Sequence, residues 1–157
     1  MDRAHVEALV ADVRAHAQGR GVVVAVAESL TGGALSEQLA KGQDAGDWFA
    51  GGVVAYRNQT KYRALGVPEG PVVTPEAARA MARGVLDLVG ADIAVAVTGV
   101  GGPGEEEGRP AGTVFSCVAT RTSVHDFSHR FDGDPEQVVE ATIVHALRQL
   151  SGVLLSL

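Results

Sequence analysis

The stretch Val22-Val-Val-Ala-Val-Ala-Glu-Ser-Leu-Thr-Gly-Gly33 joins an apolar, mostly β-branched run to the amphipathic segment Ala34–Leu39. The first part predicts a buried strand and the second a helix. Ser29 therefore lies where a strand gives way to a helix, beside backbone amides that glycine leaves uncovered. Because a helix N-terminus presents unpaired N–H groups and the positive end of a dipole, such a turn can hold a phosphate or a developing oxyanion.

Four more apolar runs, bounded by glycine, proline or polar residues, predict strands at Gly51–Tyr56, Ile93–Val97, Thr113–Ala119 and Val124–Phe131. Helical spacing and N-cap signals predict helices before Gly19, after Thr74-Pro75 and after Asp134-Pro135. The early strands are predicted to be buried on both faces, whereas Val124–Phe131 alternates. These patterns indicate an α/β fold, with a mixed sheet of about five strands between helix layers.

Composition narrows the class of protein. The 157 residues fit one domain, 1–157, and a net charge of -6 without a Lys/Arg cluster argues against a nucleic-acid partner. One cysteine, Cys117, excludes a disulfide scaffold, and no leader segment or bilayer-length apolar run is recognised. We therefore expect a cytoplasmic protein with no membrane partner.

A glycine-rich stretch, Thr98-Gly-Val-Gly-Gly-Pro-Gly104, follows the third predicted strand and contains the letters G-x-G-x-x-G. A dinucleotide fingerprint needs a helix that starts inside the motif, whereas this stretch continues into proline and three glutamates. Two interpretations remain, a simple turn or a substrate-facing loop of bare amides at the carboxyl end of a strand.

Ser29 also has two interpretations, a helix N-cap or a nucleophile. A nucleophilic serine needs a base, and no histidine suggests itself; His125 and His129 share a strand face but lack a third ligand, so no metal site is predicted. A buried lysine can serve as the base, because burial lowers its pKa. Of the two lysines, Lys61 follows a predicted strand end at Tyr56, and both residues could instead be ordinary surface residues.

Several motifs together resemble the CinA C-terminal domain family over nearly the whole chain. They are Glu28-Ser-Leu-Thr-Gly-Gly33, Gly51-Gly-Val-Val-Ala-Tyr56 with Asn58 and Lys61, Leu65-Gly-Val67, Ala94-Val-Ala-Val-Thr-Gly99, Gly102-Pro103, Pro110-Ala-Gly-Thr113 and Phe131-Asp-Gly-Asp134. The resemblance implies a three-layer α/β/α sandwich with a mostly parallel sheet, and a homo-oligomer. It implies hydrolysis of the carboxamide of nicotinamide mononucleotide to nicotinate mononucleotide and ammonia, with no metal or organic cofactor.

The resemblance also implies roles for particular residues. Ser29 would attack the amide carbon, Lys61 would take its proton, and Tyr56 would orient or relay between them. Substrate binding and oxyanion stabilisation would fall to Thr31, Gly32, Gly33, Thr98, Gly99, Gly101, Gly102 and Arg109.

Two departures from the family pattern matter. The deamidases carry arginines at the start of the last helix, where this chain has Pro135 and Val139, so Arg57, Arg109 or Arg130 would have to bind the phosphate. The loop Glu105-Glu-Glu107 is unusually acidic and would repel a phosphate unless its side chains point outward. The alternative function is therefore a catalytically weak or inactive nucleotide-binding module.

Overall fold

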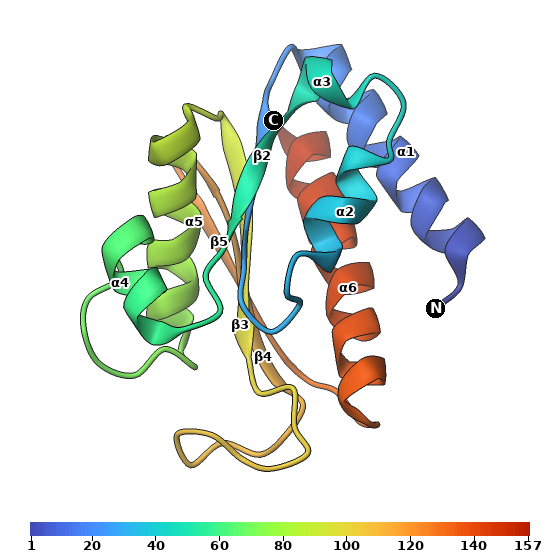
Figure 1. Cartoon of the computed structure of the whole chain (residues 1–157). Coiled ribbons are helices and arrows are strands. Elements are labelled where there is room, and N and C mark those ends of the chain that lie inside the picture. Colours follow the sequence, from blue (N-terminus) through green and yellow to red (C-terminus); the bar gives the residue numbers. More distant parts are fainter.

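A five-stranded mixed sheet with helices on both faces forms the protein, for which a computed structural model describes residues 1–157 (Figure 1). The strands are β1 (Val24–Glu28), β2 (Phe49–Val54), β3 (Ile93–Gly99), β4 (Thr113–Thr120) and β5 (Val124–Arg130). The helices are α1 (Arg3–Arg20), α2 (Ala34–Ala40), α3 (Ala45–Trp48), α4 (Asn58–Leu65), α5 (Pro75–Val89) and α6 (Pro135–Ser156).

The strand order is β2-β1-β3-β4-β5. β1 pairs in parallel with both β2 and β3, whereas β4 is antiparallel to β3 and β5. The predicted α/β fold with a mixed sheet is thus confirmed. Because β1, β2 and β3 are parallel, their carboxyl ends meet at one edge of the sheet, where open α/β sheets bind ligands.

Large and small apolar residues alternate along the central strands, so one face of the sheet carries valine or isoleucine and the other carries alanine. Val24 and Val26 of β1 pack with Ile93 and Val95 of β3 in the core cluster that includes α1, α2 and α6. The alanines between them lie in the opposite cluster, beneath α5. Helix α5 lies on one side of the sheet, and α1 and α6 lie on the other (Figure 1). Small side chains on the α5 face allow this helix to approach the sheet closely, and the larger side chains fill the space beneath α1 and α6.

The structure corrects the prediction for β2. This strand begins at Phe49, two residues early, and its residues alternate between half-buried and exposed because it is the edge strand. A short helix, α3, lies between α2 and β2. At the start of α6, Val138 is fully buried and Val139 only partly so.

Helix α6 is long and apolar enough to cross a membrane by length and composition. Half of the apolar stretch is nevertheless buried within the protein, where Ile143, Leu147 and Leu150 pack against α1 and the sheet. This is the pattern of the core helix of a globular protein, so the length of α6 is not by itself evidence for a membrane span.

Candidate active site

The turns after β1, β2 and β3 bring the predicted site residues to one edge of the sheet. Glu28 is in register with Val54, and the Ala55 amide donates to the Glu28 carbonyl oxygen over 2.8 Å. Ala27 is in register with Ala96 on the other side. The turns that carry Ser29, Ala55 and Thr98 therefore begin at the same edge of the sheet.

Glu28, for which the sequence predicted no role, organises the turn that carries Ser29. Its carboxylate is fully buried and accepts from the Thr31 hydroxyl (2.5 Å), the Leu35 amide (2.9 Å) and the Ser36 amide (2.8 Å). The Ser36 hydroxyl also donates to it over 2.6 Å. The negative charge thus satisfies the first amides of α2 and complements the helix dipole.

This arrangement decides between the two interpretations of Ser29. The N-cap position of α2 is Gly33, which makes no side-chain capping bond, and the amides that a cap would satisfy are bound by Glu28. Ser29 lies four residues before that cap and is not the capping residue. Ser29 is buried, with 8% of the residue exposed, and its hydroxyl makes no hydrogen bond within the protein.

Replacing Glu28 with alanine is expected to lower the free energy of unfolding by about 2–4 kcal/mol, because buried donors of the turn lose a charged acceptor. Urea unfolding of the wild type and the variant measures the difference. Glu37→Ala is the matched control, because the Glu37 carboxylate contacts only the exposed Lys41 on the surface of α2. A Glu28→Ala protein as stable as the control would contradict this role.

Lys61 is the buried cation of the site. It is 1% exposed, and its Nζ donates to the Tyr56 carbonyl oxygen over 3.2 Å. Burial lowers the pKa of Lys61 from its ordinary value, and the negative charges of Glu106 and Glu107 raise it part of the way back. The surface-lysine interpretation is therefore excluded, and a buried amine with a lowered pKa is suited to accept a proton.

Tyr56 contacts Lys61 through its backbone and not through its phenol. The side chain is 68% exposed at the end of the turn after β2. The carbonyl oxygen of Tyr56 accepts the hydrogen bond from Lys61, and the ring takes no part in it. In this structure the orienting contact is thus a main-chain one.

Three of the predicted binding residues are engaged inside the protein. The Thr31 hydroxyl donates to Glu28, and the Gly32 amide closes a turn onto the Ser29 carbonyl oxygen at 3.1 Å. The Thr98 hydroxyl donates to the Val72 carbonyl oxygen over 2.8 Å and is buried. These three donors are used within the protein, and none of them is free to bind a ligand in this structure.

The other predicted binding residues lie in the turn after β1, at the end of β3 and in the loop between β3 and β4. The amides of Gly33 and Gly101 make no hydrogen bond within the chain. A Cβ on Gly99 would lie 2.6 Å from the Thr113 carbonyl oxygen, so this glycine permits the close approach of β4. Gly102 has a φ of +90°, and the Arg109 guanidinium lies 4.8 Å from the centre of the Phe115 ring.

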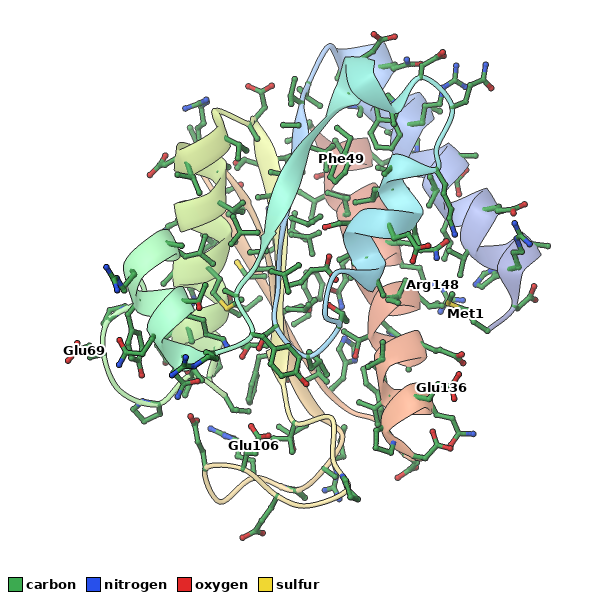
Figure 2. The ribbon with its side chains drawn as sticks, viewed as in Figure 1. Met1, Phe49, Glu69, Glu106, Glu136 and Arg148 are labelled. Atoms are coloured by element: carbon green, nitrogen blue, oxygen red, sulfur yellow. The ribbon has the colours of Figure 1, made fainter.

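The acidic loop between β3 and β4 turns one carboxylate inward. Glu107 accepts from the Val72 amide and from the Val73 amide, at 2.9 and 2.8 Å. Glu106 lies beside it on the loop below the strand ends (Figure 2). The Glu107 carboxylate is thus bound by main-chain amides, and its charge raises the pKa of Lys61.

Other reactive side chains lie elsewhere. The His129 ring stacks on Phe131 and contacts the tilted ring of His145. Its Nε2 lies 2.8 Å from Gln149 Nε2, so this residue joins β5 to α6. Burial raises the pKa of the Cys117 thiol to about 11, which leaves it unsuited to nucleophilic attack. No group of three or more His, Cys, Asp or Glu side chains is placed to hold a metal ion.

The start of α6 carries a helix cap. The Asp134 side chain accepts from the Gln137 amide, and the Gln137 side chain accepts from the Asp134 amide, with Pro135 in the first turn. Val139 packs against the core. Of the arginines that could replace the missing ones, Arg130 donates to the Ala111 carbonyl oxygen at 3.3 Å, and Arg57 precedes α4 at an exposed position.

A groove of about 840 Å³ lies between α1 and α2, lined in part by Arg14, Lys41 and Gln43. None of the predicted site residues lines it. Because neither Ser29 nor Lys61 lines this groove, the candidate active site at the strand ends is chosen for the chemistry of its residues and not for the size of a cavity.

Comparison with known proteins identifies the family to which the chain is similar. The family model of the CinA C-terminal domain matches residues 6–154. The chain is 38% identical over 143 residues to a CinA-like protein of Geobacter sulfurreducens, covering 87% of this chain and 35% of that protein. The chain thus spans about a third of the length of such relatives.

Shorter relatives match over most of their length. The chain is 42% identical over 130 residues to the Nicotinamide-nucleotide amidohydrolase PncC of Pseudomonas putida, covering 79% of this chain and 81% of that protein. The crystal structure of a CinA superfamily protein from Klebsiella pneumoniae superposes with a TM-score of 0.93 at 33% identity, covering 97% and 99% of the two chains. One from Agrobacterium tumefaciens gives 0.89 at 30% identity, covering 94% of each.

Proposed function

Because the chain belongs to the CinA C-terminal domain family, we propose that it hydrolyses the carboxamide of nicotinamide mononucleotide to nicotinate mononucleotide and ammonia. One observation carries the proposal. Glu28 caps α2, which leaves the Ser29 hydroxyl uncommitted at the strand ends where Lys61 is buried with a lowered pKa. A free hydroxyl and a buried amine at one edge are the parts that serine-lysine acyl transfer requires.

The chemistry follows from these two groups. The Ser29 oxygen attacks the amide carbon while Lys61 Nζ takes its proton. The tetrahedral intermediate collapses, the C–N bond breaks, and Lys61 returns the proton to the departing nitrogen, which leaves as ammonia. Water then attacks the resulting ester, and the nicotinate nucleotide leaves with its carboxylate while Ser29 regains its hydrogen. The Tyr56 carbonyl oxygen holds the lysine for both steps.

Amides in the converging turns would stabilise the oxyanion. Those of Gly33 and Gly101 make no bond within the chain and remain available as donors. The exposed Tyr56 ring would cover the nucleotide, and Arg57 or Arg109 would pair with its phosphate. Neither arginine lies at the start of α6, where the deamidases carry theirs. The phosphate would therefore bind at a different position in this protein.

The test is ammonia release from nicotinamide mononucleotide by the purified protein in EDTA. The proposal expects turnover that is unaffected by the chelator, with nicotinate mononucleotide formed in equal amount. Nicotinamide riboside, which lacks the phosphate, is the matched control substrate and is expected to react more slowly. A protein that binds the nucleotide without releasing ammonia would contradict the proposal.

A second candidate, a nucleotide-binding module without turnover, is favoured by one observation. The first turn of α6 holds an Asp134–Gln137 capping box and Pro135 in place of the family's arginine. Binding detected by calorimetry, together with no ammonia in the assay above, would select this candidate.

A further inference from the structure

The segment between α4 and α5 is held in place by hydrogen bonds to both its amide and its carbonyl groups, and one of these bonds joins it to Lys61. The Val72 amide donates to Glu107, at 3.1 and 2.9 Å from its two carboxylate oxygens, and the Val73 amide donates to one of them at 2.8 Å. The Val72 carbonyl oxygen accepts from Thr98 on β3. At its other end the segment begins at Val67, whose amide donates to the Lys61 carbonyl oxygen over 3.2 Å.

The turn that carries Glu107 imposes a strained backbone conformation on that residue. Glu106 and Arg109 form an isolated β-bridge, and the two residues between them, Glu107 and Gly108, have φ of +54° and +72°. A two-residue turn with both φ values positive favours Asn-Gly or Asp-Gly, because a glutamate backbone is strained there. A strained backbone of this kind persists where another interaction compensates for it. Here the Glu107 carboxylate provides that interaction by binding two main-chain amides.

We propose that Glu107 is a positioning residue for the Ser29–Lys61 site, tying the Val67–Val73 segment to the β3–β4 loop and holding the surroundings of Lys61 in place. The proposal rests on the proposed function only for its kinetic effect. Two charged groups on this loop, Glu106 and Glu107, act on Lys61, and both oppose the effect of burial on its pKa. Glu107 differs from Glu106 in being anchored, so its charge is held at a fixed distance.

Two substitutions separate the tether from the charge. Glu107→Gln keeps one oxygen acceptor for the amides and removes the charge. Glu107→Asn suits the positive φ better than glutamate does, but its shorter side chain releases both amides. Glu105→Gln is the matched control, since it removes one charge from an exposed position of the same loop.

The structural readouts need no substrate. In Glu107→Asn, hydrogen exchange at the Val72 and Val73 amides is expected to accelerate at least tenfold, since both lose their acceptor. NMR titration of the two lysine side chains in the chain, Lys41 and Lys61, is expected to show a lower pKa for Lys61 in both Glu107 variants. Glu105→Gln is expected to leave both measurements as in the wild type.

The kinetic readout is the ammonia assay. We expect kcat of Glu107→Asn to fall about 10- to 100-fold, the size associated with a shift of roughly 1 Å in a catalytic group. Glu107→Gln is expected to move the acid limb of the activity profile to lower pH, because the base then loses its proton more easily.

The outcomes are distinct. If Glu107 were only a turn residue, Glu107→Asn would be at least as stable and active as the wild type, with unchanged exchange and titration, and that result would overturn the proposal. If the wild type releases no ammonia while the exchange and the Lys61 titration respond as stated, the proposed function fails and the positioning of Lys61 by Glu107 stands.

Discussion

Replacing Ser29 with alanine is expected to lower kcat for ammonia release by at least about 10³-fold, the scale seen when a nucleophile is removed from a serine hydrolase. The attacking oxygen disappears, while the turn remains capped by the Glu28 carboxylate. The loss therefore falls on the chemical step and not on the fold. Steady-state kinetics with nicotinamide mononucleotide measures it.

The matched control for this variant is Ser128→Ala, on β5 and away from the strand ends of β1, β2 and β3. It should retain wild-type kcat. Calorimetric binding of the nucleotide to Ser29→Ala should stay close to the wild-type affinity, which separates a loss of chemistry from a loss of binding. An alanine variant with wild-type turnover would remove Ser29 from the mechanism.

Replacing Lys61 with methionine is expected to lower kcat by a comparable factor and to abolish the acid limb of the pH profile. In the wild type the base must be unprotonated, so activity should fall as the pH drops below the folded pKa of Lys61, which burial holds below 10.5. Methionine has a similar length and cannot accept a proton. The measurement is kcat across pH for both proteins, and a profile shared by the two would rule out Lys61 as the base.

The stability of the same variant tests the burial of the lysine. Because its pKa is lower in the folded state, the unfolded chain binds the proton more tightly. The free energy of unfolding of the wild type should therefore rise with pH, relative to Lys61→Met, between the folded pKa and 10.5. Below the folded pKa the methionine protein should be the more stable one, since it buries no charge.

Much of the fold was available from local patterns. Apolar runs bounded by turn residues placed all five strands within about two residues, and Thr74 and Asp134 marked two helix starts that the structure confirms. The burial of β2 was predicted wrongly, because burial depends on whether a strand lies at the edge of the sheet. The order of strands depends on contacts between residues distant in sequence.

The strand ends that carry Ser29 and Thr98 were predictable from the sequence, but the hydrogen bonds around them were not. The contacts of Glu28 and Glu107 depend on where each carboxylate points. A signal for Glu28 did exist, namely an acidic residue between a wholly apolar strand and a helix start without a capping side chain. The sequence contains no such signal for Glu107, because nothing in the glycine-rich loop distinguishes it from the two glutamates before it. Only the folded structure shows that the Val72 and Val73 amides bind this one.

The most direct test of the account is to identify the acylated residue. The protein is mixed with nicotinamide mononucleotide, quenched in acid within the first turnover, digested and analysed by mass spectrometry. The account predicts a nicotinate-nucleotide acyl group on the peptide that contains Ser29, and none on the Ser29→Ala protein. An acyl group on another residue, or full ammonia release by Ser29→Ala, would contradict it.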